Sequence, residues 1–219
     1  MNGYRLLVFD WDGTLMDSQA RIVACIQAAA RDAGAAVPTP DAARQIIGLG
    51  LREAMDRLFP EVTESVVGDI VERYRHHFLG ADPTPSVLFP GVVETLEALS
   101  EAGFLLGVAT GKSRRGLDQV LEETGLRRLF AATRCADETL SKPHPQMLEE
   151  VMGVLGAEPA ETLMIGDTEF DMQMARNARV PAVAVAYGVH EPERLIAEGA
   201  LTCLDRIDEL PPWLAAARR

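Results

Sequence analysis

Four short segments of the chain are almost entirely apolar and show no alternation of apolar and polar side chains. They span residues 6–9, 104–109, 163–165 and 182–186. Strands without alternation are expected to be buried on both faces. Helical patterns separate the later strands, at residues 92–102, 116–123, 145–155 and 170–178. This repetition predicts an α/β fold with a Rossmann-like parallel sheet and right-handed crossovers, to which residues 201–204 could add an edge strand.

The segment from residue 18 to about residue 78 breaks this rhythm, because its apolar residues recur at helical spacing. The recurring positions are Ile22, Ile26 and Ala30, and then Val66, Ile70, Tyr74 and Phe78. We therefore predict an all-helical insert of about four helices at residues 18–82, within an α/β core formed by residues 1–17 and 83–219. An insert at this point lies above the carboxyl ends of the strands, where open α/β sheets bind ligands.

Composition and charge narrow the class of partner. The 219-residue chain has a formal net charge of −12, which argues against nucleic acid and anionic membranes as partners. A bound metal ion and a few placed cations could still attract an anionic small molecule. Three scattered cysteines, no signal region and no membrane-length apolar run predict a reduced, cytoplasmic protein.

The most informative polar residues follow the first predicted strand. Asp10 and Asp12 are two residues apart, so their side chains point to the same side of an extended chain, and Gly13 lets the chain turn away. Two adjacent carboxylates repel each other unless a cation or a shared proton intervenes, which suits a divalent ion and a phosphoryl group. An ordinary Asp-Gly turn is the alternative, but it gives no reason for a charge at Asp10.

The sequence Asp-Trp-Asp-Gly-Thr-Leu-Met-Asp-Ser at residues 10–18 resembles the first signature of the haloacid dehalogenase-like superfamily, in its phosphatase form. The resemblance implies that Asp10 is a nucleophile that becomes an aspartyl phosphate. It also implies that Asp12 is the general acid and base, and that residues 18–82 form a helical cap. Three later segments match the family's remaining signatures in the expected order.

Two of these segments supply candidate phosphate ligands. At the end of the second strand, the hydroxyl of Thr110 and the backbone N–H of Gly111 could hold phosphate oxygens, although the family usually has asparagine where this chain has Gly111. An ordinary strand-to-helix turn capped by Thr110 is the alternative. Lys142, in Ser-Lys-Pro-His-Pro, matches the family's lysine, and its ammonium would neutralise charge on the nucleophile and the phosphoryl group. A solvated surface lysine is the alternative there.

The last segment carries the predicted metal site. An apolar strand ends in Gly166-Asp167, and Asp171 follows on the first turn of a helix. Mg²⁺ prefers oxygen ligands and keeps several waters, so it needs few protein carboxylates. The resemblance implies Mg²⁺ held by Asp10, the backbone carbonyl of Asp12, and Asp167. Asp171 is either a further ligand or a residue that orients Lys142 or a bound water.

The resulting functional prediction is a Mg²⁺-dependent phosphomonoester hydrolase that acts on a small phosphorylated metabolite through an aspartyl phosphate. Phosphoglycolate phosphatases are the nearest resemblance in cap type and motifs, while β-phosphoglucomutase, pyrophosphatase and nucleotidase relatives share both. Haloacid dehalogenases do not need Asp12, Asp167 or Asp171, and a cap without lysine excludes phosphonoacetaldehyde hydrolase. An alternative of another class is a non-catalytic phospho-aspartate switch module.

The specificity residue and the assembly are less constrained. Arg52 follows a glycine-punctuated turn in the predicted cap, and its guanidinium could pair with a substrate carboxylate such as that of phosphoglycolate. An exposed arginine in the first turn of a helix is an equally good interpretation. Both a monomer and a homodimer are compatible with the sequence.

Overall fold

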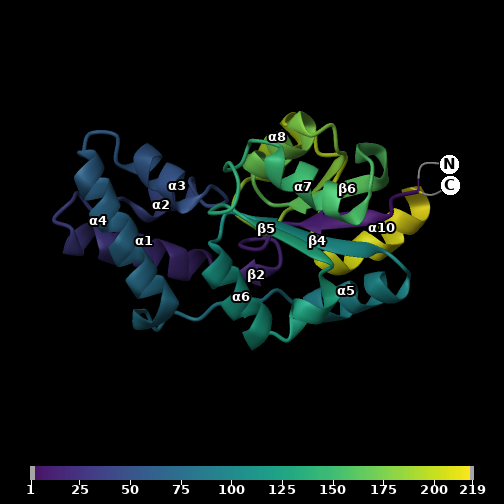
Figure 1. The fold of residues 1–219 in the computed structure, drawn as a ribbon, viewed down its shortest axis with the longest axis horizontal. Helices are drawn as coiled ribbons and strands as arrows, with labels where there is room; N and C mark the ends of the chain where they lie inside the picture. The colour runs from purple at the N-terminus through teal and green to yellow at the C-terminus, as the bar shows by residue number, and fades with distance from the viewer. Residues whose placement is uncertain (1–2, 218–219) are drawn as a thin grey trace.

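The computed structural model describes residues 3–217, and a single parallel sheet organises most of them (Figure 1). Its six strands run in the order β5-β4-β1-β6-β7-β8, and every neighbouring pair is parallel. The strands are β1 (Leu6–Phe9), β4 (Leu105–Thr110), β5 (Ala132–Cys135), β6 (Thr162–Gly166), β7 (Ala182–Val185) and β8 (Cys203–Leu204). The predicted α/β fold with a parallel sheet is thus confirmed.

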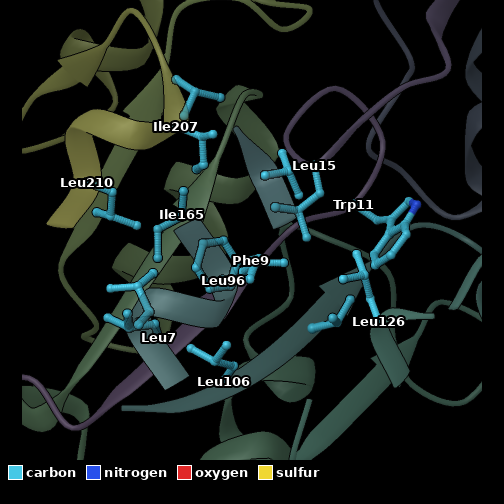
Figure 2. Close-up of a cluster of buried hydrophobic side chains, with 14 of the residues drawn as sticks. Leu7, Phe9, Trp11, Leu15, Leu96, Leu106, Leu126, Ile165, Ile207 and Leu210 are labelled. Carbon is cyan, nitrogen blue, oxygen red and sulfur yellow. The ribbon is translucent and has the colours of Figure 1, made fainter. Parts of the chain in front are cut away.

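Helices cover both faces of the sheet. One face carries α5 (Val92–Glu101), α6 (Arg114–Glu123) and α10 (Leu210–Ala217), and the other carries α7 (Gln146–Leu155), α8 (Glu169–Asn177) and α9 (Pro192–Ala197). In β1, Leu7 and Phe9 belong to the first apolar cluster, while Leu6 and Val8 belong to the second. Figure 2 shows Phe9 beside Leu96 of α5 in the first cluster. This double burial explains why the strand sequences do not alternate.

The segment between β1 and the rest of the sheet is helical, as the spacing of its apolar residues predicts. It contains α1 (Gln19–Asp32), α2 (Pro40–Arg44), α3 (Leu51–Leu58), α4 (Glu64–His76) and the π-helix η1 (His77–Ala81). These helices surround an apolar cluster of their own, and they extend to one side of the sheet in Figure 1. The division into core and cap at residues 18 and 82 remains our prediction. The chain enters and leaves the helical segment through β2 (Met16–Asp17) and β3 (Val87–Leu88), which pair antiparallel.

Several elements were not predicted from the sequence, among them β5, α9, α10 and the β2–β3 pair, and β8 is shorter than expected. Strand β5 was missed because Thr133 and Arg134 interrupt its apolar character at the edge of the sheet. Helix α10 was missed because Pro211 and Pro212 suggest a break, although proline is tolerated in the first turn of a helix. Short 3₁₀ turns complete the fold at η2 (Leu126–Leu129), η3 (Pro159–Glu161) and η4 (Ile207–Glu209). Among residues 3–217, no helix has both the length and the apolar character needed to cross a bilayer.

Candidate active site

The candidate active site lies at the carboxyl ends of the three central strands. Asp10 directly follows β1, Thr110 ends β4, and Asp167 directly follows β6. Because β1 pairs with both β4 and β6, these three residues meet at one edge of the sheet. All three are buried, with at most 1% of their surface exposed. The motifs that are far apart in the sequence therefore converge at one place in the fold.

Lys142 lies at the centre of this cluster and is completely buried. Its Nζ donates to Oδ1 of Asp10 and to Oδ1 of Asp171, each at 2.7 Å. The loop that delivers it contains a cis peptide bond between Lys142 and Pro143. The surface-lysine alternative is therefore ruled out by the burial of this side chain. Its predicted role toward a substrate stays a prediction.

Burial and mutual repulsion shift the pKa values of the cluster. Burial raises the pKa of Asp10 to about 7, against the lowering effect of Lys142. Burial, and then the charges of Asp10 and Asp171, raise the pKa of Asp167 well above its ordinary value. Burial alone would lower the pKa of Lys142, but its two carboxylate partners raise it above its ordinary value. When all three carboxyl groups are ionised, the cluster holds more negative charge than one lysine neutralises.

These carboxylates fit a divalent cation. One oxygen each from Asp10, Asp167 and Asp171 can be chosen so that all three lie within 4.8 Å of one another. Within the described part of the chain, Oδ2 of Asp10 is buried and has no hydrogen-bond partner. Such an orphaned anionic oxygen is costly unless a cation or a donor completes it. The hard oxygen donors are those that Mg²⁺ prefers.

Neighbouring groups hold the carboxylates of Asp167 and Asp171 in fixed orientations. Asp167 accepts from Oγ1 of Thr14 and from the backbone N–H of Val189, both at 2.8 Å. A Cβ on Gly13 or on Gly188 would lie 2.1 or 2.2 Å from the nearest atom of Asp167, so only glycine fits on either side of it. The φ of Gly13, +86°, is also one that favours glycine.

Asp171 is held through both of its carboxylate oxygens. Its Oδ2 accepts from the hydroxyl of Thr168 at 2.7 Å and from the backbone N–H of Thr168 at 3.0 Å, which also caps α8. Its Oδ1 accepts from Lys142, so the contact expected of a residue that orients this lysine is present. Whether Asp171 also coordinates the metal stays a prediction.

Asp12 has hydrogen-bond partners outside the three-carboxylate cluster. Its Oδ1 accepts from Oγ of Ser18 at 2.5 Å and from Nζ of Lys112 at 2.9 Å. The same ammonium lies 4.5 Å from the centre of the Phe78 ring, in the helical segment. The predicted metal contact through the Asp12 backbone carbonyl remains untested. Sequence analysis missed the roles of Ser18 and Lys112, although Lys112 is one of only two lysines in the chain.

The loop after β4 is in tight contact with the helical segment. The backbone N–H of Lys112 donates to Oγ1 of Thr110 at 3.2 Å, so this hydroxyl forms a turn at the strand end. A Cβ on Gly111 would lie 2.4 Å from the carbonyl oxygen of Leu49 and 2.8 Å from that of Gly48. Glycine therefore replaces the family's usual asparagine where the backbone of residues 48–49 closes on the site. The phosphate-binding roles of Thr110 and Gly111 stay predictions.

Arg52 lies further from the carboxylates, at the start of α3. Half of its side chain is exposed, and it pairs with Asp56 at 3.1 Å and with Glu64 at 3.5 Å. It lines the same cavity as Asp10 and Asp12. Its predicted role in binding a substrate carboxylate stays a prediction, and it would have to compete with these two partners.

Comparison with known proteins agrees with this geometry. The family model for haloacid dehalogenase-like hydrolases matches residues 7–185. A protein named phosphoglycolate phosphatase from Agrobacterium fabrum is 35% identical over 84% of this chain and 81% of its own. A protein named "Probable phosphatase IndB" from Dickeya dadantii is also 35% identical, over 94% of this chain and 91% of its own.

A crystal structure described as a predicted phosphoglycolate phosphatase from Haemophilus somnus superimposes with a TM-score of 0.87. It is 25% identical in sequence, and the match covers 95% of this chain and 97% of that one. Motifs, fold and relatives all agree with the resemblance expected from the sequence, and the chain belongs to the haloacid dehalogenase-like hydrolase family, alongside relatives named phosphatases.

Proposed function

We propose that this protein is a Mg²⁺-dependent phosphomonoester hydrolase that forms an aspartyl phosphate on Asp10. The observation that carries the proposal is the unpartnered Oδ2 of Asp10, buried beside Lys142 and two further carboxylates. The lysine donates to Oδ1 of this carboxylate, and Oδ2 has no hydrogen-bond partner among residues 3–217. Phosphatase names among the relatives support the same reaction.

The proposed hydrolysis consists of two displacements at phosphorus. In the first, an Asp10 oxygen bonds to phosphorus while the bond to the leaving oxygen breaks, and Asp12 gives that oxygen a proton. In the second, Asp12 takes a proton from a water, whose oxygen bonds to phosphorus and releases the Asp10 carboxylate and inorganic phosphate. Lys142, the hydroxyl of Thr110 and the N–H of Gly111 hold the phosphate oxygens.

A bound Mg²⁺ would be held by Asp10 and Asp167, with Asp171 beside them, and would offset negative charge on the phosphoryl group. Because the transition state is loose, the protein's main contributions are positioning and charge neutralisation. The Asp167 contacts with Thr14 and Val189 and the Lys142 contact with Asp171 supply the positioning before substrate binds.

We expect the substrate to be a small phosphorylated metabolite. Phosphoglycolate is one candidate, supported by the names of relatives, but the same motifs serve several leaving groups.

Cys25, Cys135 and Cys203 are all free thiols, which supports the expectation of a reducing, cytoplasmic setting.

The decisive experiment measures hydrolysis of p-nitrophenyl phosphate with Mg²⁺ and with excess chelator, for the native protein and Asp10→Asn. We expect Mg²⁺-dependent turnover that the substitution abolishes, because an amide cannot act as the nucleophile. A phospho-aspartate switch would be phosphorylated once and would not turn over. Circular dichroism and the melting temperature check that Asp10→Asn is folded.

A further inference from the structure

A cavity of about 390 Å³ separates the candidate active site from the helical segment. Asp10 and Asp12 belong to its lining, as do Ser113 and Lys112, which pairs with Asp12. The volume falls within the range of about 300–1,000 Å³ that is typical of pockets for drug-sized ligands. The two-carbon leaving group of phosphoglycolate would fill only a small part of this space.

One wall of the cavity is mainly apolar and comes from the helical segment. It is formed by Ile22, Ile26, Ile46, Ile47, Met55, Tyr74, Phe78 and Leu79. The rings of Tyr74 and Phe78 stack with their centres 5.5 Å apart and their planes inclined by 16°. Burial, and then the charge of Asp12, raise the pKa of Tyr74 well above its ordinary value, so this phenol stays neutral. The wall therefore offers apolar surface and one uncharged hydroxyl.

The cations that line the cavity, within residues 3–217, are three, and each has a carboxylate partner. Arg52 pairs with Asp56 and Glu64, and Lys112 pairs with Asp12. Arg75 pairs with Glu72. The lining also contains five carboxylates, those of Asp10, Asp12, Glu53, Asp56 and Asp137. A carboxylated leaving group would thus enter an acidic cavity without a free cation to meet it.

We infer, on the basis of the proposed function, that the enzyme selects phosphomonoesters whose leaving group is uncharged, larger than glycolate and apolar on one face. An aromatic alcohol or a nucleoside has these properties. Its apolar face would be removed from water against Tyr74 and Phe78, which favours binding. A carboxylate in the same position would lose hydration without gaining an ion pair, which disfavours it.

The first test compares pairs of substrates that differ in charge or in size. We expect kcat/KM for phenyl phosphate to exceed that for p-carboxyphenyl phosphate by about tenfold or more. Carboxyphenolate is the better leaving group, so chemical reactivity alone would give the opposite order. We also expect kcat/KM for naphthyl phosphate to exceed that for phosphoglycolate by about tenfold or more.

The second test changes the cavity itself, with Leu51→Trp and Leu58→Trp as a matched pair. Both leucines are half-buried on α3 and pack against the apolar cluster of the helical segment, but of the two only Leu51 lines the cavity. We expect Leu51→Trp to raise KM for naphthyl phosphate about tenfold, with a much smaller effect on phosphoglycolate. Leu58→Trp should leave KM for both substrates unchanged, and melting temperatures check that both variants are folded. Calorimetric binding of naphthyl phosphate to Asp10→Asn and Asp10→Asn/Leu51→Trp gives the same comparison without turnover.

The outcomes separate the inference from the function on which it rests. A higher kcat/KM for phosphoglycolate than for naphthyl phosphate would overturn the inference and leave the phosphatase intact. So would a loss in Arg52→Ala confined to carboxylated substrates, which would identify Arg52 as the carboxylate-binding residue. Failure to hydrolyse any ester, p-nitrophenyl phosphate included, would overturn the proposed function and the inference together.

Discussion

Replacing Gly111 with alanine tests whether the helical segment closes on the site as the structure has it. The added Cβ would lie 2.4 Å from the carbonyl oxygen of Leu49, whereas ordinary van der Waals contact begins at 3.4 Å. The backbone of residues 48–49 would therefore have to retreat by about 1 Å. Both atoms in this collision belong to the backbone or are fixed to it, so no side-chain rotation can relieve it.

A displacement of this size is large for a catalytic site, where about 1 Å of misplacement can cost about 100-fold in rate. We expect Gly111→Ala to lower kcat/KM for p-nitrophenyl phosphate by about 10- to 100-fold. Overpacking should also reduce the free energy of unfolding by about 1–3 kcal/mol, as measured by urea denaturation.

Gly153→Ala provides the control, because a Cβ on Gly153 in α7 meets nothing within 4 Å. Alanine is the better residue inside a helix, so this variant should gain about 0.5–1 kcal/mol and keep native kcat/KM. Native kcat/KM and stability in Gly111→Ala would refute the reasoning, since residues 48–49 could then not approach Gly111 during turnover.

Three further predictions concern the carboxylates. Asp12→Ala should lower the rate by about 10²- to 10⁴-fold and accumulate phosphorylated Asp10 with p-nitrophenyl phosphate, because the leaving group of this substrate needs little protonation. Rapid-quench mass spectrometry that detects no phosphoenzyme would contradict the two-step scheme. Asp167→Ala should weaken Mg²⁺ binding more than Asp171→Ala in calorimetry, because Asp171 already pairs with the Lys142 ammonium, whereas both donors to Asp167 are uncharged. The reverse order would make Asp171 the principal ligand. Because burial raises the pKa of Asp10 to about 7, Mg²⁺ must displace a proton from this carboxyl group below that pH. The affinity for Mg²⁺ should therefore increase from about pH 5 to about pH 8, with release of a proton on binding. An affinity that does not depend on pH would contradict the raised pKa.

Residues at strand ends and in proline-rich loops were the most predictable part of the site. A local sequence pattern marks each of these residues and can be recognised without knowledge of the fold. An apolar run precedes Asp10 and Asp167, and a Pro-x-Pro pattern follows Lys142. Topology alone then brings them together, because the carboxyl ends of parallel strands share one edge of the sheet.

Contacts between the helical segment and the sheet were not predictable in this way. The pair formed by Lys112 and Asp12 joins residues that are 100 positions apart in the chain. The approach of Leu49 to Gly111 depends on how the helices sit over the sheet, which no local pattern of apolar residues specifies. Strand β5 and helix α10 were missed for a different reason, since tertiary packing overrides the polar and proline residues in them.

The two glycines that enclose Asp167 would affect the entropy of the metal binding that we propose. A carboxylate with Gly13 and Gly188 against it and two donors on its oxygens has lost its rotational freedom on folding, before any ion arrives. Metal binding would then cost little further conformational entropy at this residue, and the Asp167 oxygens could not easily move to accept a larger ion. Mg²⁺ takes oxygens at about 2.0–2.1 Å, whereas Ca²⁺ requires about 2.3–2.6 Å and more ligands. A fixed Asp167 carboxylate would therefore favour the smaller ion, and we expect Ca²⁺ to be a poor substitute.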